Sequence, residues 1–191
     1  MPTTPPQVVL QPLPPARSDL LKQFLYLAIH VPNGRPLPFD IIDNDPEIKR
    51  YWDGFGSQIG DIGIMAIDTK TAEVIGCAWG RALPKDAPGF GYLADDIPEV
   101  GLALLPEYQR KGIGTALLRT LLAAYASDPN APSGTGWQQI SLSTTRTNKV
   151  AQQVYENLGF RIVKEDDAGD LLMVTDLDPQ KTGEPEQVGS G

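Results

Sequence analysis

Six consecutive residues, Gln109-Arg110-Lys111-Gly112-Ile113-Gly114, have the composition of an anion-binding turn. Gly112 and Gly114 have no side chains, so a phosphate can approach the backbone closely, and Arg110 and Lys111 add two positive charges. The residues that follow have helical periodicity, and a helix N-terminus presents unpaired N–H groups and a partial positive charge. The segment therefore predicts a loop that holds a phosphate or pyrophosphate.

A turn that merely joins a strand to a buried helix is the alternative interpretation of this segment. Two other phosphate-binding patterns fit it poorly. The Walker pattern requires Gly-Lys-Ser/Thr after four intervening residues, which this segment lacks, and the dinucleotide fingerprint requires a third glycine where the chain has Leu117. An unrelated nucleotide-binding α/β enzyme is therefore disfavoured.

The elements on either side of this loop are predicted to be a strand and a helix. Residues 99–104 form a short apolar run, which turns at Pro106. From Ile113 onward, apolar residues recur at helical spacing and form a broad stripe through Ala116, Leu117, Leu118, Leu121, Leu122, Ala124 and Tyr125. This stripe predicts a helix that is mostly buried against a sheet.

Composition favours an ordinary globular protein. The chain has 191 residues, of which 41% are apolar and 21% charged, and no apolar stretch approaches the roughly 20 residues of a membrane helix. Its single cysteine, Cys77, excludes an internal disulfide and predicts a buried thiol in a reducing, cytoplasmic setting. The N-terminus lacks the pattern of a secretory leader. We expect no membrane partner.

The net charge of −8 is concentrated near one end of the chain. Eight acids and two bases lie from Lys164 onward, so the preceding residues are close to neutral. Because no basic stripe is present, we expect no nucleic-acid partner. We predict a Pro-rich arm over residues 1–16, a single domain over 17–177 and a flexible acidic tail over 178–191.

The other predicted elements follow in chain order. They are a strand at 8–10, a helix capped by Ser18 or Asp19 that runs to Ile29, a short helix over 46–52, a hairpin of strands 61–67 and 74–83, a strand over 139–144, a helix over 148–158 ending at Gly159, and a terminal hairpin of strands 160–164 and 171–177. A proline-rich loop containing the lone histidine, His30, is expected near an opening. In the helix over 148–158, we expect a core stripe of Val150, Val154 and Leu158, with Asn148 and Tyr155 on the neighbouring stripe. This order predicts an α/β fold, a mixed sheet with helices on both faces.

Two motifs in this chain resemble those of the GNAT acetyltransferases. The first is Gln109-x-x-Gly112-x-Gly114, which matches the coenzyme A motif Gln/Arg-x-x-Gly-x-Gly/Ala after a strand that ends in Pro. The second is Asn148-x-x-Ala151-x-x-x-Tyr155-x-x-x-Gly159-Phe160, which matches at all five fixed residues. The resemblance covers roughly residues 60–177, and the chain looks like a bacterial-type member. It implies a GNAT-like, mostly antiparallel sheet.

The resemblance implies acetyl-CoA as cosubstrate and no metal. The backbone of Leu102, Ala103 and Leu104 would pair with the pantetheine arm, and Asn148 would contact the same arm. Gln109 belongs to the motif, and the pyrophosphate would be bound by the amides of Arg110, Lys111, Gly112, Ile113, Gly114 and Thr115. We expect Gly101 to mark a bulge at which neighbouring strands part.

Acetyl transfer requires a neutral amine, a stabilised oxyanion and a protonated leaving thiolate. Tyr155, with an ordinary pKa near ~10, can stay protonated and donate to the thiolate. The alternative is that Tyr155 only fills space between helix and sheet. For the base we expect Glu99, acting directly or through water, although alternation places it on the opposite side of the strand from Leu102 and Leu104. Some relatives have a glutamate on the later strand, where this chain has Ser143.

The sequence therefore predicts an N-acetyltransferase that moves an acetyl group from acetyl-CoA to a primary amine of a small molecule or protein. A non-catalytic acyl-CoA-binding module is the alternative, because Ser143 replaces a carboxylate and the position of Glu99 is ambiguous. The sequence leaves open the acceptor and the oligomeric state, including a homodimer.

Overall fold

The structure is a computed structural model and describes residues 7–29 and 37–178. The strands are β1 (Val8–Pro12), β2 (Ile62–Asp68), β3 (Val74–Arg81), β4 (Glu99–Leu104), β5 (Gln139–Thr145), β6 (Arg161–Glu165) and β7 (Asp170–Asp176). The helices are α1 (Leu20–Ala28), α2 (Ile41–Asn44), α3 (Pro46–Lys49), α4 (Ile113–Ala126) and α5 (Lys149–Asn157). Two short 3-10 helices, Pro15–Arg17 and Pro106–Tyr108, complete the described elements.

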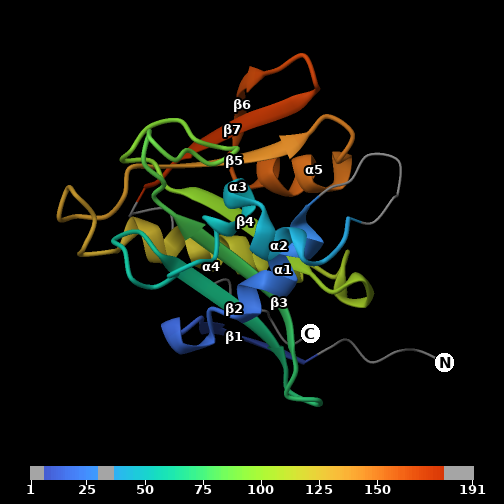
Figure 1. The fold of residues 1–191 in the computed structure, drawn as a ribbon. Coiled ribbons are helices and arrows are strands. Elements are labelled where there is room, and N and C mark those ends of the chain that lie inside the picture. Colours follow the sequence, from blue (N-terminus) through green and yellow to red (C-terminus); the bar gives the residue numbers. More distant parts are fainter. Residues whose placement is uncertain (1–6, 30–36, 179–191) are drawn as a thin grey trace.

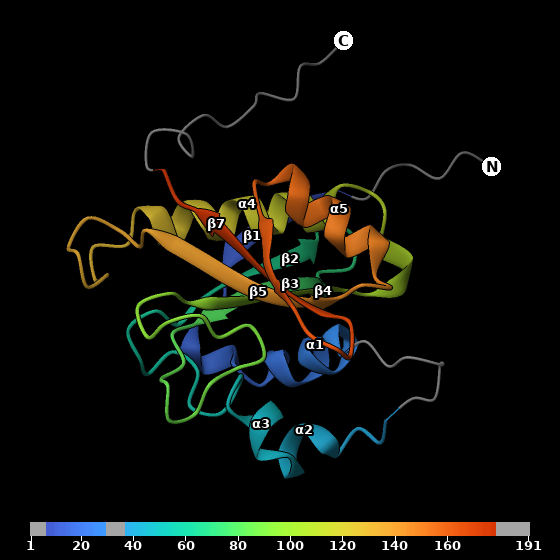
Figure 2. The same ribbon diagram turned by 90° about the horizontal axis from the view of Figure 1, so that it is seen from above.

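One sheet in the order β1-β2-β3-β4-β5-β7-β6 organises these elements. Helices α4 and α5 cover one face, and α1, α2 and α3 cover the other (Figure 1; Figure 2). All neighbouring strands pair antiparallel except β4 and β5, which are parallel. The predicted α/β class, with a mostly antiparallel sheet between helices, is confirmed.

Each face of the sheet has its own apolar core. On the α4 side, the buried stripe predicted from residue 113 onward packs Leu117, Leu121 and Tyr125 against the sheet. On the other side, Leu21 and Phe24 of α1 pack against a second cluster that includes Trp79 of β3. The sheet therefore separates a helix that begins with the predicted phosphate loop from a helical layer formed by the first third of the chain.

Several predictions fall outside the described residues. These are residues 1–6 of the Pro-rich arm, His30 with the following residues 31–36, and residues 179–191 of the acidic tail. The predicted strand at 8–10 is present as β1, which pairs with β2. The limits of the arm, the domain and the tail stay predictions.

The helix over 148–158 was placed correctly, and Val154 and Leu158 of its predicted core stripe pack against the core, but Val150 does not. Val150 is 62% exposed, whereas Gln152 and Tyr155 are the buried residues of α5. The cause is a polar anchor, because Nε2 of Gln152 donates to the carbonyl oxygens of Thr145 at 2.8 Å and Arg146 at 3.0 Å. This contact turns the side of α5 that carries Tyr155 toward the sheet.

Two smaller predictions also need correction. Asp19 precedes α1 but makes no side-chain capping bond. The expected bulge at Gly101 is absent, because β3 and β4 pair in continuous register from Gly76 with Leu104 to Arg81 with Glu99. Gly101 instead provides space, since a Cβ atom there would lie 2.7 Å from the Trp79 ring.

Candidate active site

The site is built where β4 and β5 part. The two strands share one register pair, Glu99 with Ser141, next to a bond from the Ser141 N–H to the Pro98 carbonyl at 3.0 Å. Residues 101–104 of β4 therefore have a partner strand, β3, along one edge only. A cavity of about 800 Å³ adjoins this edge. Its lining includes residues of α1 on one face of the sheet and of α4 on the other.

The predicted phosphate loop lies at this cavity and has the backbone that its glycines allow. Gly112 is the residue before α4 and has φ +79°, a conformation that glycine adopts without strain. A Cβ atom on Gly112 would meet nothing within 4 Å, so the space above this backbone is open. A Cβ atom on Gly114 would make only ordinary contacts with Leu104 and Leu102, at 3.4 and 3.5 Å. The open space at Gly112 is suited to a group that binds the backbone.

The other residues of this loop have distinct roles. Nε2 of Gln109 donates to the Leu104 carbonyl at 3.2 Å and so ties the loop to the end of β4. Arg110 has φ +58° and lines the cavity with Gln109 and Thr115. Nζ of Lys111 lies 5.4 Å from the centre of the Tyr108 ring, and the Ile113 side chain is buried in the core. Ile113 can therefore present only its backbone amide to a ligand in this cavity, whereas the Lys111 side chain is exposed.

The predicted residues of the second motif line the same cavity. Oδ1 of Asn148 accepts the Ala151 N–H at 3.2 Å and caps α5. Asn148, Ala151, Val154 and Tyr155 all contribute to the lining, as does Ser143. The Tyr155 ring is buried and lies 5.8 Å, centre to centre, from the Phe160 ring. Burial raises the pKa of the Tyr155 hydroxyl to about 12, so it is protonated at neutral pH.

Glu99 lies on the α1 side of the sheet and is 6% exposed. The Tyr51 hydroxyl donates to its Oε1 at 2.8 Å, whereas its buried Oε2 has no hydrogen-bond partner among the described residues. Burial raises the pKa of Glu99 to about 7, opposed by the Tyr51 bond, a backbone bond from Gly91 and the charge of Arg50. The carboxyl group therefore changes charge near neutral pH, as a general base must.

The ambiguity over the side on which Glu99 lies has a structural answer. Without a bulge in β4, Glu99 does lie on the opposite face from Leu102 and Leu104, as alternation predicts. All three nevertheless line one cavity, because this cavity extends from the α1 side to the α4 side where β4 and β5 separate. A carboxylate on one face and a strand edge beside the other helix can thus serve one site.

Tyr51 is a site residue that the sequence did not reveal. It follows α3 without any motif and is placed by tertiary contacts, including a bond from the Phe90 N–H to its oxygen at 2.6 Å. The Phe90 ring stacks on the Tyr51 ring at 6.1 Å and 9°, and Phe90 is 63% exposed at the cavity wall. Burial and the neighbouring Glu99 raise the pKa of the Tyr51 hydroxyl well above its usual range, so Tyr51 acts as a hydrogen-bond donor.

The two ends of the cavity differ in polarity. The end beside α1 has apolar walls formed by Leu25, Leu27, Ala28, Ile29 and Ile48. The end beside α4 has Arg110, the backbone of Gly112 and Gly114, and Thr115. Among residues 7–29 and 37–178, no group of three or more His, Cys, Asp or Glu is arranged to hold a metal ion. No helix in the same ranges is long and apolar enough to span a bilayer.

Known proteins resemble this chain in sequence and in fold. A family model described as "Acetyltransferase (GNAT) domain" matches residues 60–162. A protein named N-alpha-acetyltransferase from Saccharolobus solfataricus is 29% identical over 78% of this chain and 79% of its own length. A second protein of that name, from Sulfurisphaera tokodaii, is 34% identical over 49% of this chain, and the match spans only 56% of that protein.

A solved structure supports the same fold. The paia N-acetyltransferase of Thermoplasma acidophilum, in complex with coenzyme A, has a TM-score of 0.59 to this chain at 17% identity, covering 89% of this chain and 99% of the other. At this identity the likeness concerns the fold alone, whereas the family match extends over more than half of the chain. The chain therefore belongs to the GNAT family of acetyltransferases.

Proposed function

We propose that this GNAT protein transfers the acetyl group of acetyl-CoA to a primary amine by direct attack on the thioester, and that the amine is the α-amino group of a polypeptide. The observation that carries the proposal is the carboxylate of Glu99 in the cavity that also holds Tyr155 and the loop before α4. The chain itself thus supplies a candidate base, a candidate acid and a phosphate-binding loop. The names of the two curated relatives support the same acceptor.

The donor would lie along β4 and the start of α4. We assign the pantetheine arm to the edge of Leu102, Ala103 and Leu104 that has no partner strand, with Asn148 beside it. The pyrophosphate is assigned to the backbone amides from Arg110 to Thr115, where the helix N-terminus attracts negative charge. The open space at Gly112 fits this assignment, because nothing within 4 Å blocks approach to its backbone.

Glu99 is assigned the role of base. A carboxylate with a pKa of about 7 is close to half ionised at neutral pH, and its Oε2 has no hydrogen-bond partner in the described residues. Removing a proton from an α-ammonium group, with pKa about 7.7–8.0, then costs about one pKa unit. A lysine ammonium with pKa about 10.4 would cost more than three. The basicity of Glu99 therefore favours an α-amine over a lysine side chain.

Tyr155 is assigned the role of acid. Its raised pKa keeps the hydroxyl protonated, so it can donate to the thiolate as the thioester bond breaks. An N–H of β4 near Leu104 would stabilise the negative charge that develops on the carbonyl oxygen. The base and the acid come from β4 and α5, and residues of both elements line the cavity where β4 and β5 part.

The acceptor can be tested with three matched amines. A lysine-free peptide with a free N-terminus, the same peptide N-terminally blocked and carrying one lysine, and spermidine are each incubated with acetyl-CoA, and products are identified by mass spectrometry. We expect acetylation of the first alone or at least tenfold faster. Preferred acetylation of the lysine or of spermidine would overturn the choice of acceptor.

Thermal unfolding, read together with the acetylation assay, separates an enzyme from a binding module. Acetyl-CoA at 100 times its dissociation constant should raise the melting temperature by about 5–11 °C. Such a shift without acetylation of any amine would favour the non-catalytic module, and an equal shift with ATP or NAD would remove the acetyl-CoA site.

Two further predictions concern the setting of the protein. Cys77 is fully buried and burial raises its pKa to about 12, so the thiol is unreactive, and a reducing cytoplasm is the setting that we propose. A homodimer is a further prediction, which light scattering of the purified chain would test.

A further inference from the structure

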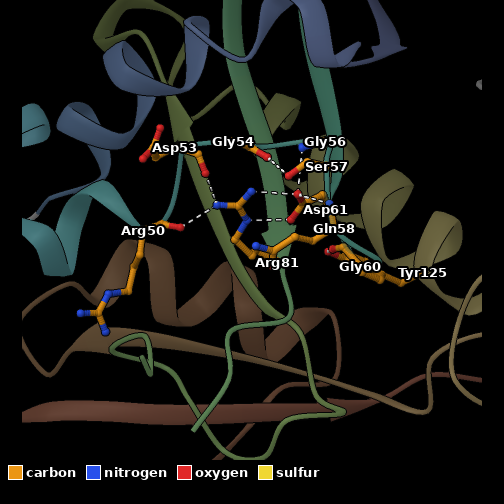
Figure 3. A network of polar contacts seen from close by, with 10 residues as sticks. All are labelled: Arg50, Asp53, Gly54, Gly56, Ser57, Gln58, Gly60, Asp61, Arg81 and Tyr125. Carbon is orange, nitrogen blue, oxygen red and sulfur yellow. Dashed lines mark hydrogen bonds and ion pairs between the residues drawn. The ribbon is translucent and has the colours of Figure 1, made fainter. Parts of the chain in front are cut away.

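A buried ion pair joins Arg81 of β3 to Asp61, the residue before β2 (Figure 3). Nε of Arg81 donates to Oδ1 of Asp61 at 2.7 Å, and Nη2 donates to Oδ2 at 2.8 Å. The two side chains are 3% and 0% exposed. A bidentate pair of this kind has a fixed geometry, because two parallel N–H bonds constrain both planes.

The rest of the Arg81 guanidinium binds the backbone on either side of Tyr51. Nη1 donates to the carbonyl oxygens of Arg50 and Asp53, each at 2.8 Å. Oδ2 of Asp61 also accepts the N–H groups of Gly56 at 2.8 Å and Gln58 at 3.2 Å. Figure 3 shows these bonds converging on the ion pair from the loop between α3 and β2. One ion pair therefore ties this loop to the sheet along most of its length.

A second anchor lies next to this network. The hydroxyl of Tyr125, from α4, donates to the Gly60 carbonyl at 2.6 Å, one residue before Asp61 (Figure 3). A Cβ atom on Gly80 of β3 would lie 2.3 Å from this hydroxyl, so the tyrosine passes closely by the sheet backbone. The loop is thus held from both α4 and β3.

Tyr51 connects this network to Glu99. Arg81 and Glu99 are register partners on β3 and β4, so their side chains leave the same face of the sheet. The Arg81 guanidinium nevertheless binds Asp61 and the backbone around Tyr51, while the Tyr51 hydroxyl binds Oε1 of Glu99 at 2.8 Å. Arg81 does not line the cavity.

Other groups that face Glu99 come from two segments. Arg50 lies next to Tyr51 in sequence; its charge lowers the pKa of Glu99, and its Nη1 donates to the Pro88 carbonyl. The loop between β3 and β4 adds the Gly91 backbone, which lowers the pKa of Glu99, and the Phe90 N–H, which donates to the Tyr51 oxygen. The segment that carries Arg50 and Tyr51 therefore supplies both side chains that act on Glu99 from outside the sheet.

We propose that the Arg81–Asp61 ion pair is a positioning device for the base, which fixes the backbone around Tyr51 so that the Tyr51 hydroxyl holds Glu99 in its working orientation. This inference rests on the proposed function, because it takes Glu99 as the base. Arg81 is a positioning residue that acts through Tyr51 and contacts neither reactant.

The test is a double-mutant cycle of Arg81→Lys and Tyr51→Phe, read by the pH dependence of kcat/KM with the α-amine peptide. Lysine keeps the positive charge but cannot make four directed bonds from one nitrogen. Tyr51→Phe removes the hydrogen bond to Glu99 that favours the charged carboxylate. The acidic limb of the pH profile, where kcat/KM falls as the pH is lowered, should therefore move to higher pH by about one unit. Arg81→Lys should move it in the same direction by less, and should add no shift in the Tyr51→Phe background.

Asp128→Asn is the control for mere loss of stability. Asp128 is a buried carboxylate that follows α4, and its Oδ2 accepts from Nε1 of Trp137 at 3.0 Å, without a hydrogen bond to Tyr51, Asp61 or Arg81 among the described residues. We expect Asp128→Asn to lower the melting temperature without moving the acidic limb. If Arg81→Lys does the same, or shifts the limb equally with and without Tyr51, the positioning role is overturned.

Two further variants separate failure of the positioning role from failure to fold and from failure of the proposed function. If Arg81→Lys does not fold, Asp61→Glu keeps both charges and displaces the carboxylate by one methylene, and the same non-additive shift is expected. Glu99→Gln is measured alongside, because an acidic limb that stays near pH 7 in that variant, and does not move to the pKa of the peptide amine at about 7.7–8.0, removes Glu99 as the base and so counts against the proposed function itself.

Discussion

The two ends of the cavity are assembled in different ways. At the α4 end, consecutive residues from Gln109 to Thr115 surround one helix N-terminus, and their backbone is the surface that we assign to the pyrophosphate. At the α1 end, Glu99, Tyr51 and Phe90 come from three separate segments and depend on hydrogen bonds between side chains and backbone. The first end needs only local geometry, whereas the second needs the whole fold. Variants at the two ends should therefore fail in different ways.

The largest expected effect is at the base. Glu99→Gln keeps the shape of the side chain but removes the proton acceptor, and general-base catalysis contributes about 10²- to 10⁴-fold. We expect a loss of that size in kcat/KM with the α-amine peptide, while the melting shift given by acetyl-CoA is retained. If Glu99→Gln also lost the rise in melting temperature with acetyl-CoA, the α1 end of the cavity could not be altered without affecting cofactor binding at the α4 end.

The next largest effect is at the loop. Gly112→Val places a β-branched residue at φ +79° and fills the open space above the backbone. We expect the stabilisation by acetyl-CoA, about 5–11 °C, to disappear. Gly134→Val is the matched control, because Gly134 has φ +71°, equally open space and a position remote from the loop. A shift that survives in Gly112→Val would contradict the assignment of this loop.

A smaller effect is expected for the acid. Tyr155→Phe keeps the packing of the buried ring but removes the proton donor, so we expect about a 100-fold slower release of free thiol at saturating substrate, the lower end of the range for acid–base catalysis. Tyr108→Phe is the control, because the Tyr108 hydroxyl binds Asp68 and is not part of the cavity lining. Equal rates in Tyr155→Phe and the unmodified protein would leave Tyr155 as a packing residue only.

The smallest expected effect is on stability. The folded-state pKa of Glu99, about 7, lies above the ordinary 4.5 of an unfolded glutamate. The buried charge therefore costs nothing below pH 4.5, an increasing amount as the pH rises toward 7, and its full amount above pH 7. The free energy of unfolding of Glu99→Gln, relative to that of the unmodified protein, should therefore rise by up to about 3 kcal/mol from pH 5 to pH 8. Thermal unfolding at the two pH values measures this difference.

The sequence predicted the elements at the α4 end of the cavity closely. The two motifs and their flanking apolar patterns placed the strand before the loop, the helix after it and α5 correctly, because each depends on residues that are close in the chain. The prediction that Val150 belongs to the core stripe of α5 was wrong, because the Gln152 anchor to Thr145 and Arg146 determines which side of that helix is buried.

The α1 end could not be predicted to the same depth. Glu99 was identified, but its relation to the cavity depends on where β4 and β5 separate. The two strands do part near Gly101, as expected, but without the expected bulge. Tyr51 and Arg81 lie in no motif, and their importance follows from contacts over 48 and 20 residues. Composition gives no indication that a buried arginine would bind the backbone on either side of a tyrosine.

The most direct test of the account is the pH dependence of kcat/KM for a lysine-free peptide with a free N-terminus, compared between the unmodified protein and Glu99→Gln. We expect an acidic limb near pH 7 in the unmodified protein, set by the raised pKa of Glu99, and in the variant a limb that has moved to the pKa of the peptide amine itself, about 7.7–8.0. The same limb in both proteins would contradict it and would place the base elsewhere in the molecule.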